Sequence, residues 1–308
     1  MKKIFVIFSS MIAFCLCACS EGQEPKEEWK APDYAEGEYE AMMEIYEALH
    51  LDKSDYYNGR VNFWGSKINW RWNGVTREYD PETSKYYVTK LKLENLPYAS
   101  DAYLPDVFDR FSRLEELCIN GEYIINDEEI PGKYETVTLL KFPASICECR
   151  LDALKFNAFK GIAPSNFSNL ANTLEYLCIY NTEVGNELLA ALDGFTKLKE
   201  AYLMHNGFTG KIPFLGQCSV TIFDNNDFTE FNWEYLKSRD TLMRLPSLLG
   251  NGNLQGPWKM TAEEIHLKDY TYDELSSVLY ERLSMGLDYP PFYCDWIEFS
   301  KLNPSWRQ

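Results

Sequence analysis

Apolar and polar residues alternate over five or six positions at six places along the chain. In each segment inward-facing and outward-facing residues take turns, as in Leu174-Glu-Tyr-Leu-Cys-Ile179. A period of two is typical of a β-strand with one buried face. If Leu203 is the second inward residue of one strand, its counterparts are Leu93, Ile119, Leu154, Ile179 and Phe223. The steps between these six residues are 26, 35, 25, 24 and 20, which predicts short strands that recur and stack side by side.

Polar and turn-forming residues recur at fixed offsets after the predicted strands. Asn206 and Asn226 follow the second inward residue by three positions, and Asn157 has the same offset from Leu154. An amide side chain at this offset can bind the backbone of neighbouring turns. Gly and Pro then recur, which predicts a tight return along the far side. They occur in Phe159-Lys-Gly161-Ile-Ala-Pro164 and Phe208-Thr-Gly210-Lys-Ile-Pro213.

The most regular stretch is Leu198 to Pro213, LKEAYLMHNGFTGKIP, with the order L-x-x-A-x-L-x-x-N-x-F-x-G-x-I-P. It resembles the leucine-rich repeat family, and its ending resembles the plant-type subclass. The resemblance covers roughly Val88 to Trp258 and is most specific from Leu151 to Phe228. It implies an α/β fold, a solenoid with a parallel sheet on its concave face and helical caps at both ends. The 35-residue step predicts an insertion or another repeat around Val137.

The segment before the repeats predicts a cap. Glu36 to Leu51 is expected to form a helix, because apolar side chains recur on one of its faces. These side chains are Met42, Ile45, Tyr46 and Leu49. The stretch Trp70-Arg-Trp72-Asn-Gly-Val75 resembles the W-x-G-V signature of the N-terminal cap on plant-type repeats. A solenoid needs such a lid over its first repeat, although the tryptophans, with Trp64, could instead form a platform for a sugar.

The chain therefore divides into five parts. Residues 1–18 are predicted to be a lipoprotein signal peptide, 19–35 an acidic linker and 36–87 the N-terminal cap. Residues 88–258 hold the leucine-rich repeats. Residues 259–308 form a C-terminal cap or a docking segment, and helices are expected at 261–267 and 273–283, the second with apolar residues on one side.

The first residues predict export. Lys2 and Lys3 precede an apolar run from Ile4 to Leu16, which is too short for a spanning helix. The ending Leu16-Cys-Ala-Cys19 resembles a bacterial lipobox, which implies lipidation of Cys19 and attachment to a membrane through that lipid. The acidic residues that follow resemble the export signal on surface lipoproteins of the Bacteroidetes. We therefore expect an outer-membrane lipoprotein exposed at the cell surface.

Charge and cysteine content narrow the functional classes. The chain has 47 acidic and 30 basic residues, a net charge of −17, which disfavours nucleic acid as a ligand.

Cys118 and Cys178 take the same outward position with at least one strand between them, so they are too far apart for a disulfide. The oxidation state of the six cysteines after Cys19 is otherwise open: Cys118, Cys147, Cys149, Cys178, Cys218 and Cys294.

No catalytic or metal-binding signature stands out. The sequence lacks H-E-x-x-H and G-x-S-x-G. Cys147-Glu-Cys149 alone does not supply the four ligands of structural zinc, and the three histidines lie in separate segments. The acidic pairs are those expected of a solvated surface. We therefore expect neither enzymatic activity nor a metal or cofactor.

The predicted strands place a set of exposed side chains on the concave sheet. Tyrosine provides a large contact area at low entropic cost, and its hydroxyl recognises polar groups. The tyrosines could also simply pack on one another as cross-strand neighbours. The candidate ligand-binding residues are Tyr176, Tyr180, Glu200, Tyr202, Met204, Lys92 and Lys155.

These features predict a non-catalytic recognition or adhesion module that binds a protein or peptide on the concave sheet. Two alternatives remain open at this point. One is a glycan-binding surface lipoprotein that holds polysaccharide on Trp or Tyr platforms. The other is an accessory hydrolase with its site in the C-terminal region.

Overall fold

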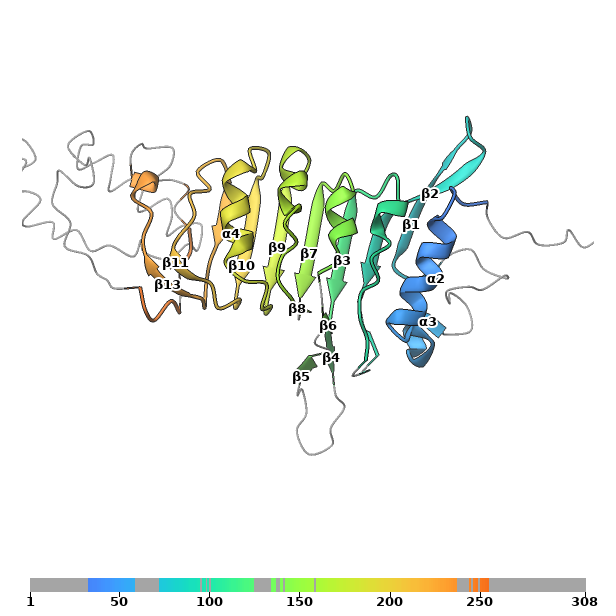
Figure 1. The fold of residues 1–308 in the computed structure, drawn as a ribbon, viewed down its shortest axis with the longest axis horizontal. Coiled ribbons are helices and arrows are strands. Elements are labelled where there is room, and N and C mark those ends of the chain that lie inside the picture. The colour runs from blue at the N-terminus through green and yellow to red at the C-terminus, as the bar shows by residue number, and fades with distance from the viewer. Residues whose placement is uncertain are drawn as a thin grey trace, which may run out of the picture. The chain divides into compact units, whose positions relative to one another are not determined.

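The structure, a computed structural model, describes residues 33–58, 72–94, 96–97, 99, 101–124, 134–136, 139–140, 142–157, 159–236, 244, 246–248 and 250–254. All of them belong to one unit, Pro32–Gln308. A seven-stranded sheet runs through this unit in the order β1-β2-β3-β7-β9-β10-β12 (Figure 1). Only β1 and β2 pair antiparallel, and each later strand lies parallel to the one before it.

The strands of this sheet are short, as the alternating pattern predicts. They are β1 Val75–Asp80, β2 Lys85–Leu93, β3 Glu116–Asn120, β7 Ala153–Asn157, β9 Tyr176–Tyr180, β10 Glu200–Met204 and β12 Val220–Ile222. One bridge, from Ile222 to Ser247, adds a further parallel partner after β12. Each turn of chain thus contributes one strand, which is an arrangement of leucine-rich repeat character.

The inward side chains of neighbouring strands stack in two rows and form one core. Ile179, Leu203 and Phe223, expected to meet in a common interior, are all fully buried in it. Hydrophobic burial of this kind is the main force holding the turns together. The second inward row is Leu93, Ile119, Phe156, Ile179 and Leu203, followed by Phe223 just after β12.

One predicted equivalence is wrong. The register pairs Ile119 with Phe156 and Phe156 with Ile179, whereas Leu154 pairs with Leu117. Leu154 is therefore the first inward residue of its strand and Phe156 the second. The error arises because side chains alternate with a period of two, so a slip of two residues leaves the same face inward.

Asn157 consequently does not occupy the position of Asn206 and Asn226. It is the last residue of β7, opposite Asn120 on β3 and Tyr180 on β9. Its Nδ2 donates a hydrogen bond to Asn120 Oδ1 at 2.9 Å. The two amides therefore link neighbouring strands at one edge of the sheet.

The long step before β7 contains an insertion, as predicted. It includes β4 Glu122–Ile124 and β5 Tyr134–Thr136, which pair antiparallel as a hairpin below the sheet (Figure 1). A short strand β6, Leu139–Leu140, then pairs parallel with β8, Phe159–Lys160. Val137 itself lies outside the described residues.

The return segments carry short helices and strands on the other side of the sheet (Figure 1). The helices are η2 Phe108–Arg110, η3 Ala144–Glu148, η4 Phe167–Asn172, α4 Glu187–Ala191, η5 Leu192–Gly194 and η6 Trp233–Leu236. Two short strands, β11 Thr209–Lys211 and β13 Asp227–Glu230, pair parallel to one another. No helix among the described residues is both long and apolar enough to cross a membrane.

The N-terminal elements contain the predicted helix, slightly shortened. The helix α2 is Glu38–Ala48, and η1 Leu51–Lys53 and α3 Asp55–Asn58 follow it. Met42, Ile45 and Leu49 are fully buried, and Tyr46 is half-buried. The boundary drawn between residues 87 and 88 falls inside β2, because that strand belongs both to the antiparallel hairpin and to the parallel sheet.

Trp72 has a packing role. Its indole is buried, with ring centroids 5.9 Å from Tyr34 and 5.8 Å from Tyr39. A buried ring cannot offer its face to a sugar, so Trp72 is not part of a glycan platform. Trp64 and Trp70 lie outside the described residues, as do Cys19, Cys294 and the helices expected at 261–267 and 273–283.

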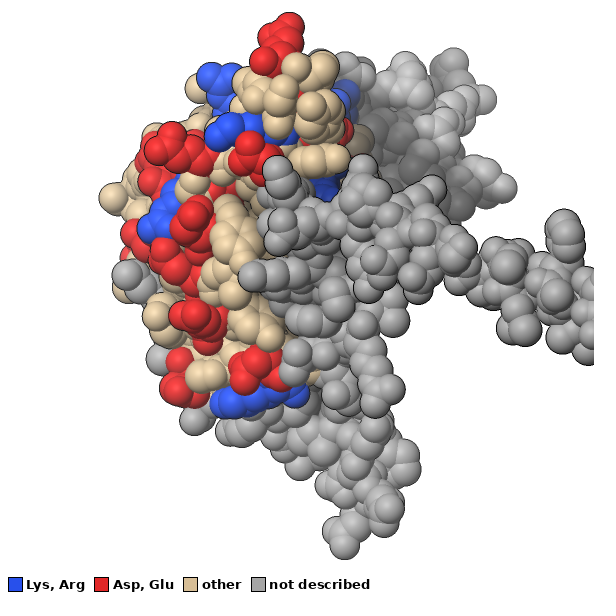
Figure 2. Space-filling view, turned by 90° about the vertical axis from the view of Figure 1, so that its right-hand side faces the viewer, with Lys and Arg blue, Asp and Glu red and all other residues tan. Residues whose placement is uncertain are grey.

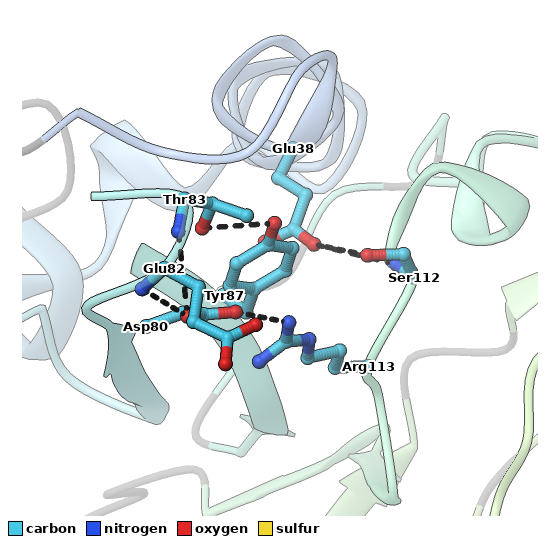
Figure 3. Close-up of polar contacts among 7 residues, drawn as sticks. All are labelled: Glu38, Asp80, Glu82, Thr83, Tyr87, Ser112 and Arg113. Atoms are coloured by element: carbon cyan, nitrogen blue, oxygen red, sulfur yellow. Dashed lines mark hydrogen bonds and ion pairs between the residues drawn. The ribbon is translucent and has the colours of Figure 1, made fainter. Parts of the chain in front are cut away.

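A buried carboxylate joins α2 to the sheet (Figure 3). Glu38 is fully buried, and its Oε2 accepts the backbone N–H of Val88 on β2 at 2.8 Å. Its Oε1 accepts the N–H and hydroxyl of Ser112, which precedes β3, at 3.3 and 3.4 Å. Burial raises the pKa of this carboxyl, although the hydrogen bonds from Val88 and Ser112 act in the opposite direction.

A second group of contacts closes the β1–β2 hairpin beside Glu38 (Figure 3). The Asp80 carboxylate accepts the backbone N–H groups of Glu82 at 2.8 Å and Thr83 at 3.4 Å, and it pairs with Arg113. The Arg113 guanidinium lies over the Tyr87 ring, 3.8 Å from its centroid. The hydrogen bond from Arg113 lowers the pKa of Asp80. These contacts hold the hairpin against the first parallel turn.

An asparagine ladder connects the C-terminal turns. Asn226 is buried, and its Oδ1 accepts the backbone N–H of Asn206 at 2.9 Å. Its Nδ2 donates to the carbonyls of Leu203 at 2.7 Å and Phe223 at 2.8 Å. Asn206 binds the preceding turn in the same way, because its Oδ1 accepts the N–H of Thr182 at 3.0 Å. The offset of Asn206 and Asn226 predicted this role.

The ladder has a member that the sequence pattern did not identify. Asn251 Oδ1 accepts the N–H of Phe228 at 3.3 Å, and its Nδ2 donates to Phe223 O at 3.0 Å. The residue before each ladder position has a positive φ, between 53° and 70°, which allows the chain to turn sharply out of the strand. These residues are Asn181, His205, Asn225 and Gly250.

Candidate functional site

The outward side chains of the parallel strands form three rows, which we call the outward face. Two rows run across all six parallel strands, and all seven candidate ligand-binding residues lie in the three rows. The first row is Lys90, Glu116, Ala153, Tyr176, Glu200 and Val220. The second is Lys92, Cys118, Lys155, Cys178, Tyr202 and Ile222. The third is Asn120, Asn157, Tyr180 and Met204.

The β2 and β3 part of the outward face carries paired charges. Glu116 lies between two lysines, with Lys90 Nζ 2.8 Å and Lys92 Nζ 3.3 Å from its carboxylate oxygens. The hydrogen bond from Lys90 is the main cause of the lowered pKa of Glu116. Lys92 therefore lies on the predicted face, but a neighbouring carboxylate offsets its charge.

Two buried thiols lie in the middle row. Cys118 and Cys178 have only β7 between their strands, which separates their backbones by about 10 Å and prevents a disulfide. Both are free thiols. Burial raises the pKa of Cys118 to about 12 and also raises that of Cys178. Both side chains are therefore neutral and poor nucleophiles at physiological pH.

Lys155 lies between these thiols on the middle strand of the face. Its register partners are Cys118 on one side and Cys178 on the other. The side chain is half-buried. Among the described residues, no carboxylate lies within ion-pair distance of its ammonium group. Lys155 thus differs from Lys90 and Lys92, whose charges face Glu116.

Tyrosines dominate the β9 and β10 part of the face. The Tyr176 and Tyr202 rings are 5.5 Å apart at their centroids, and the Tyr202 hydroxyl donates to Glu200 Oε2 at 3.0 Å. The Tyr180 and His205 rings pack edge to face, with their centroids 6.2 Å apart. The tyrosines do pack on cross-strand neighbours, yet they remain partly exposed. The face therefore presents aromatic rings that pack on their neighbours and remain partly exposed.

Sequence reasoning missed part of this surface. Val220 and Ile222 extend the first two rows across β12 and are half-buried. In Val220-Thr-Ile222-Phe223 a threonine faces inward and two aliphatic residues face outward, so polarity alone does not mark the outward face. Counting back from Phe223 would have placed both aliphatic residues on it. Ile222 lies beside Tyr202 and enlarges the apolar part of the surface.

The remaining described cysteines have structural contacts. The Cys149 thiol donates to the carbonyl of Phe108 at 3.1 Å, and the Cys218 thiol donates to that of Leu198 at 3.4 Å. Burial raises the pKa of Cys147 and of Cys149 to about 12. No three metal-ligating side chains converge within the described part of the chain. Cys147 and Cys149 therefore belong to the packed interior.

Acidic side chains predominate on the described surface at one end of the sheet. Figure 2 looks onto the end of the sheet that carries α2 and β1, and acidic side chains cover more of the described surface there than basic ones. This agrees with the net charge of −17. On the outward face Lys155 is a local exception, because it has no carboxylate partner among the described residues.

Comparisons with known proteins give only distant likenesses. No protein-family model matches the chain, and neither does any curated protein. Among solved structures, the leucine-rich repeat ectodomain of the receptor kinase SOBIR1 from Arabidopsis thaliana is 17% identical, with a TM-score of 0.37. The match covers 74% of this chain and 99% of that ectodomain.

Two further solved structures are similar. A plant ice-binding protein is 18% identical over 70% of this chain and 63% of its own, with a TM-score of 0.49. The ectodomain of GASSHO1/SCHENGEN3 from Arabidopsis thaliana, solved in complex with CASPARIAN STRIP INTEGRITY FACTOR 2, is 19% identical. That match covers 70% of this chain and 32% of the ectodomain, with a TM-score of 0.43. At these identities the likeness does not extend to function.

Proposed function

We propose that this chain is a non-catalytic recognition module, a leucine-rich repeat solenoid that binds a protein or peptide on its outward face. The observation that carries the proposal is the grouping of Tyr176, Tyr180 and Tyr202 with Met204 on two adjacent strands, all partly exposed. Aromatic side chains held in place by their neighbours lose little entropy when a ligand binds. Their hydroxyl groups can also recognise polar groups of a partner.

A random peptide display library tests this proposal. Full-length protein in detergent micelles is immobilised, and the selected peptides are then assayed against variants. Tyr180→Ala combined with Tyr202→Ala is expected to weaken peptide binding at least tenfold, because truncation of buried interface tyrosines commonly costs about 1–2 kcal/mol each. Circular dichroism checks that the variant remains folded.

The matched control is Tyr79→Ala on β1. Tyr79 is 53% exposed and lies on the hairpin, away from the three rows of the outward face. This variant should bind the selected peptides as the wild type does. Equal binding by the double variant would exclude the tyrosine surface as the ligand site.

We further propose that the protein is a lipoprotein attached to the outer membrane through Cys19 and exposed at the cell surface. The support is the sequence Leu16-Cys-Ala-Cys19 after an apolar run, followed by acidic residues. Cells fed an alkyne-tagged fatty acid should label the wild-type protein, and Cys19→Ser should abolish the label while Cys118→Ser retains it.

Surface exposure is tested separately, because added protease should degrade the protein on intact cells. Labelling of Cys19→Ser would refute the anchor, and protection from protease would refute surface exposure.

A further inference from the structure

The charged residues of the outward face are paired with one another or with a tyrosine, except for Lys155. Glu116 is already engaged by Lys90 and Lys92, and Glu200 accepts the Tyr202 hydroxyl. Both carboxylates of the two complete rows therefore have partners within the protein. Lys155 has no carboxylate partner among the described residues.

The surroundings of Lys155 favour an anionic partner. Its ammonium lies on a half-buried side chain between Cys118 and Cys178, whose buried thiols are uncharged and cannot neutralise it. An ammonium and a carboxylate form a charge-assisted hydrogen bond, which is stronger than a hydrogen bond between neutral groups. A basic ligand would meet this same charge and be repelled. The cation therefore selects for an acidic group.

The neighbouring strands supply an apolar surface at a defined distance. Tyr202 is two strands from Lys155 in the same row, and Ile222 is three strands away. At about 4.8 Å per strand these separations are about 10 and 14 Å. An extended peptide rises about 3.3 Å per residue, so three to four residues span the distance.

We propose that the outward face binds an extended peptide segment that crosses the strands, with an Asp or Glu side chain on Lys155. An aromatic or aliphatic residue three or four positions away packs against Tyr202 and Ile222. This inference rests on the proposed function and adds the chemistry of the ligand. A single binding mode then accounts for Lys155, which has no carboxylate partner among the described residues, and for the apolar surface of Tyr202 and Ile222.

The test compares peptide selections on three forms of the full-length protein. Random linear nine-residue peptides are selected on the wild type, on Lys155→Gln and on Lys199→Gln. The wild type should enrich Asp or Glu three or four positions from Leu, Met, Phe, Tyr or Trp. Lys155→Gln should lose the acidic preference, whereas Lys199→Gln should keep it, since Lys199 lies outside the three rows and pairs with Glu175.

Synthetic peptides separate this proposal from the general one. An enriched peptide is made with a C-terminal amide, and as a second version with its acidic residue changed to Gln or Asn. The acidic peptide should bind the wild type at least tenfold more tightly than the peptide that carries Gln or Asn instead. The two peptides should bind Lys155→Gln with equal affinity. Thermal unfolding of Lys155→Gln confirms that the variant is folded.

Each outcome decides between the two proposals. Selected peptides that need Tyr180 and Tyr202 but show no acidic preference would overturn this inference and leave the proposed function intact. Loss of binding on removing only the terminal carboxylate would likewise overturn it, because the anion would then come from the chain end. If no peptide is enriched on the wild type, both proposals fail.

Discussion

Replacing Asn226 with Ala is expected to lower the free energy of unfolding by about 4 kcal/mol. The side chain accepts backbone N–H groups of Asn206 and Phe208 and donates to the carbonyls of Leu203 and Phe223. All four partners lose a hydrogen bond at a position that is 3% exposed. The Phe223 carbonyl keeps its hydrogen bond from Asn251, so the main loss falls on the other three groups. A buried polar group left without a partner costs about 1–3 kcal/mol, and partial relaxation reduces the sum. Urea unfolding followed by circular dichroism measures the loss.

Asn172→Ala is the matched control for this prediction. Asn172 is an exposed residue at the end of η4, so its truncation should change the free energy of unfolding by less than about 0.5 kcal/mol. Asn226→Asp separates the two halves of the interaction, because it keeps the acceptor oxygen but removes the donors to Leu203 and Phe223. It should destabilise at neutral pH as well. If Asn226→Ala and Asn172→Ala unfold at the same urea concentration, the ladder does not stabilise the repeats.

Replacing Glu38 with Ala is expected to lower the free energy of unfolding by about 3 kcal/mol. The change leaves the buried N–H of Val88 without its acceptor, removes the acceptor of the Ser112 N–H, and opens a space between α2 and the sheet. The helix would then lose its polar attachment to β2. The matched control is Glu40→Ala, because Glu40 is an exposed carboxylate on the same helix. A Glu38→Ala variant as stable as Glu40→Ala would contradict this role.

The pH dependence gives the Glu38 prediction a second readout. Burial raises the folded-state pKa of Glu38 above its ordinary value of 4.5. The folded state therefore binds this proton more readily than the unfolded state does, so the contribution of Glu38 is greatest below the ordinary pKa and decreases as the pH rises through the folded value. The difference in unfolding free energy between wild type and Glu38→Ala should thus grow as the pH falls from 7 towards 4.5. A difference that shrinks over this range would refute the direction of the shift.

Much of the repeat pattern could be predicted from the sequence because the pattern is local. Alternation along five residues identifies which side chains face inward, so the stacking of Ile179 and Leu203 followed from the chain alone. The placement of Tyr176 and Tyr202 on the opposite face followed from the same alternation. A fixed offset after the strand likewise identified Asn206 and Asn226, because one backbone turn of the same geometry recurs after β9, β10 and β12.

Only the tertiary structure decided which turns lie in register and which charges meet. Leu154 and Phe156 are both apolar and both inward, so a period of two cannot choose between them, and only pairing with β3 and β9 does. Lys92 and Lys155 look alike in sequence, but Glu116 on the neighbouring strand pairs with one of them and not the other. Glu38 reads as a solvated helix residue until packing against β2 buries it. These features depend on contacts between residues distant in sequence, which no local pattern of polarity encodes.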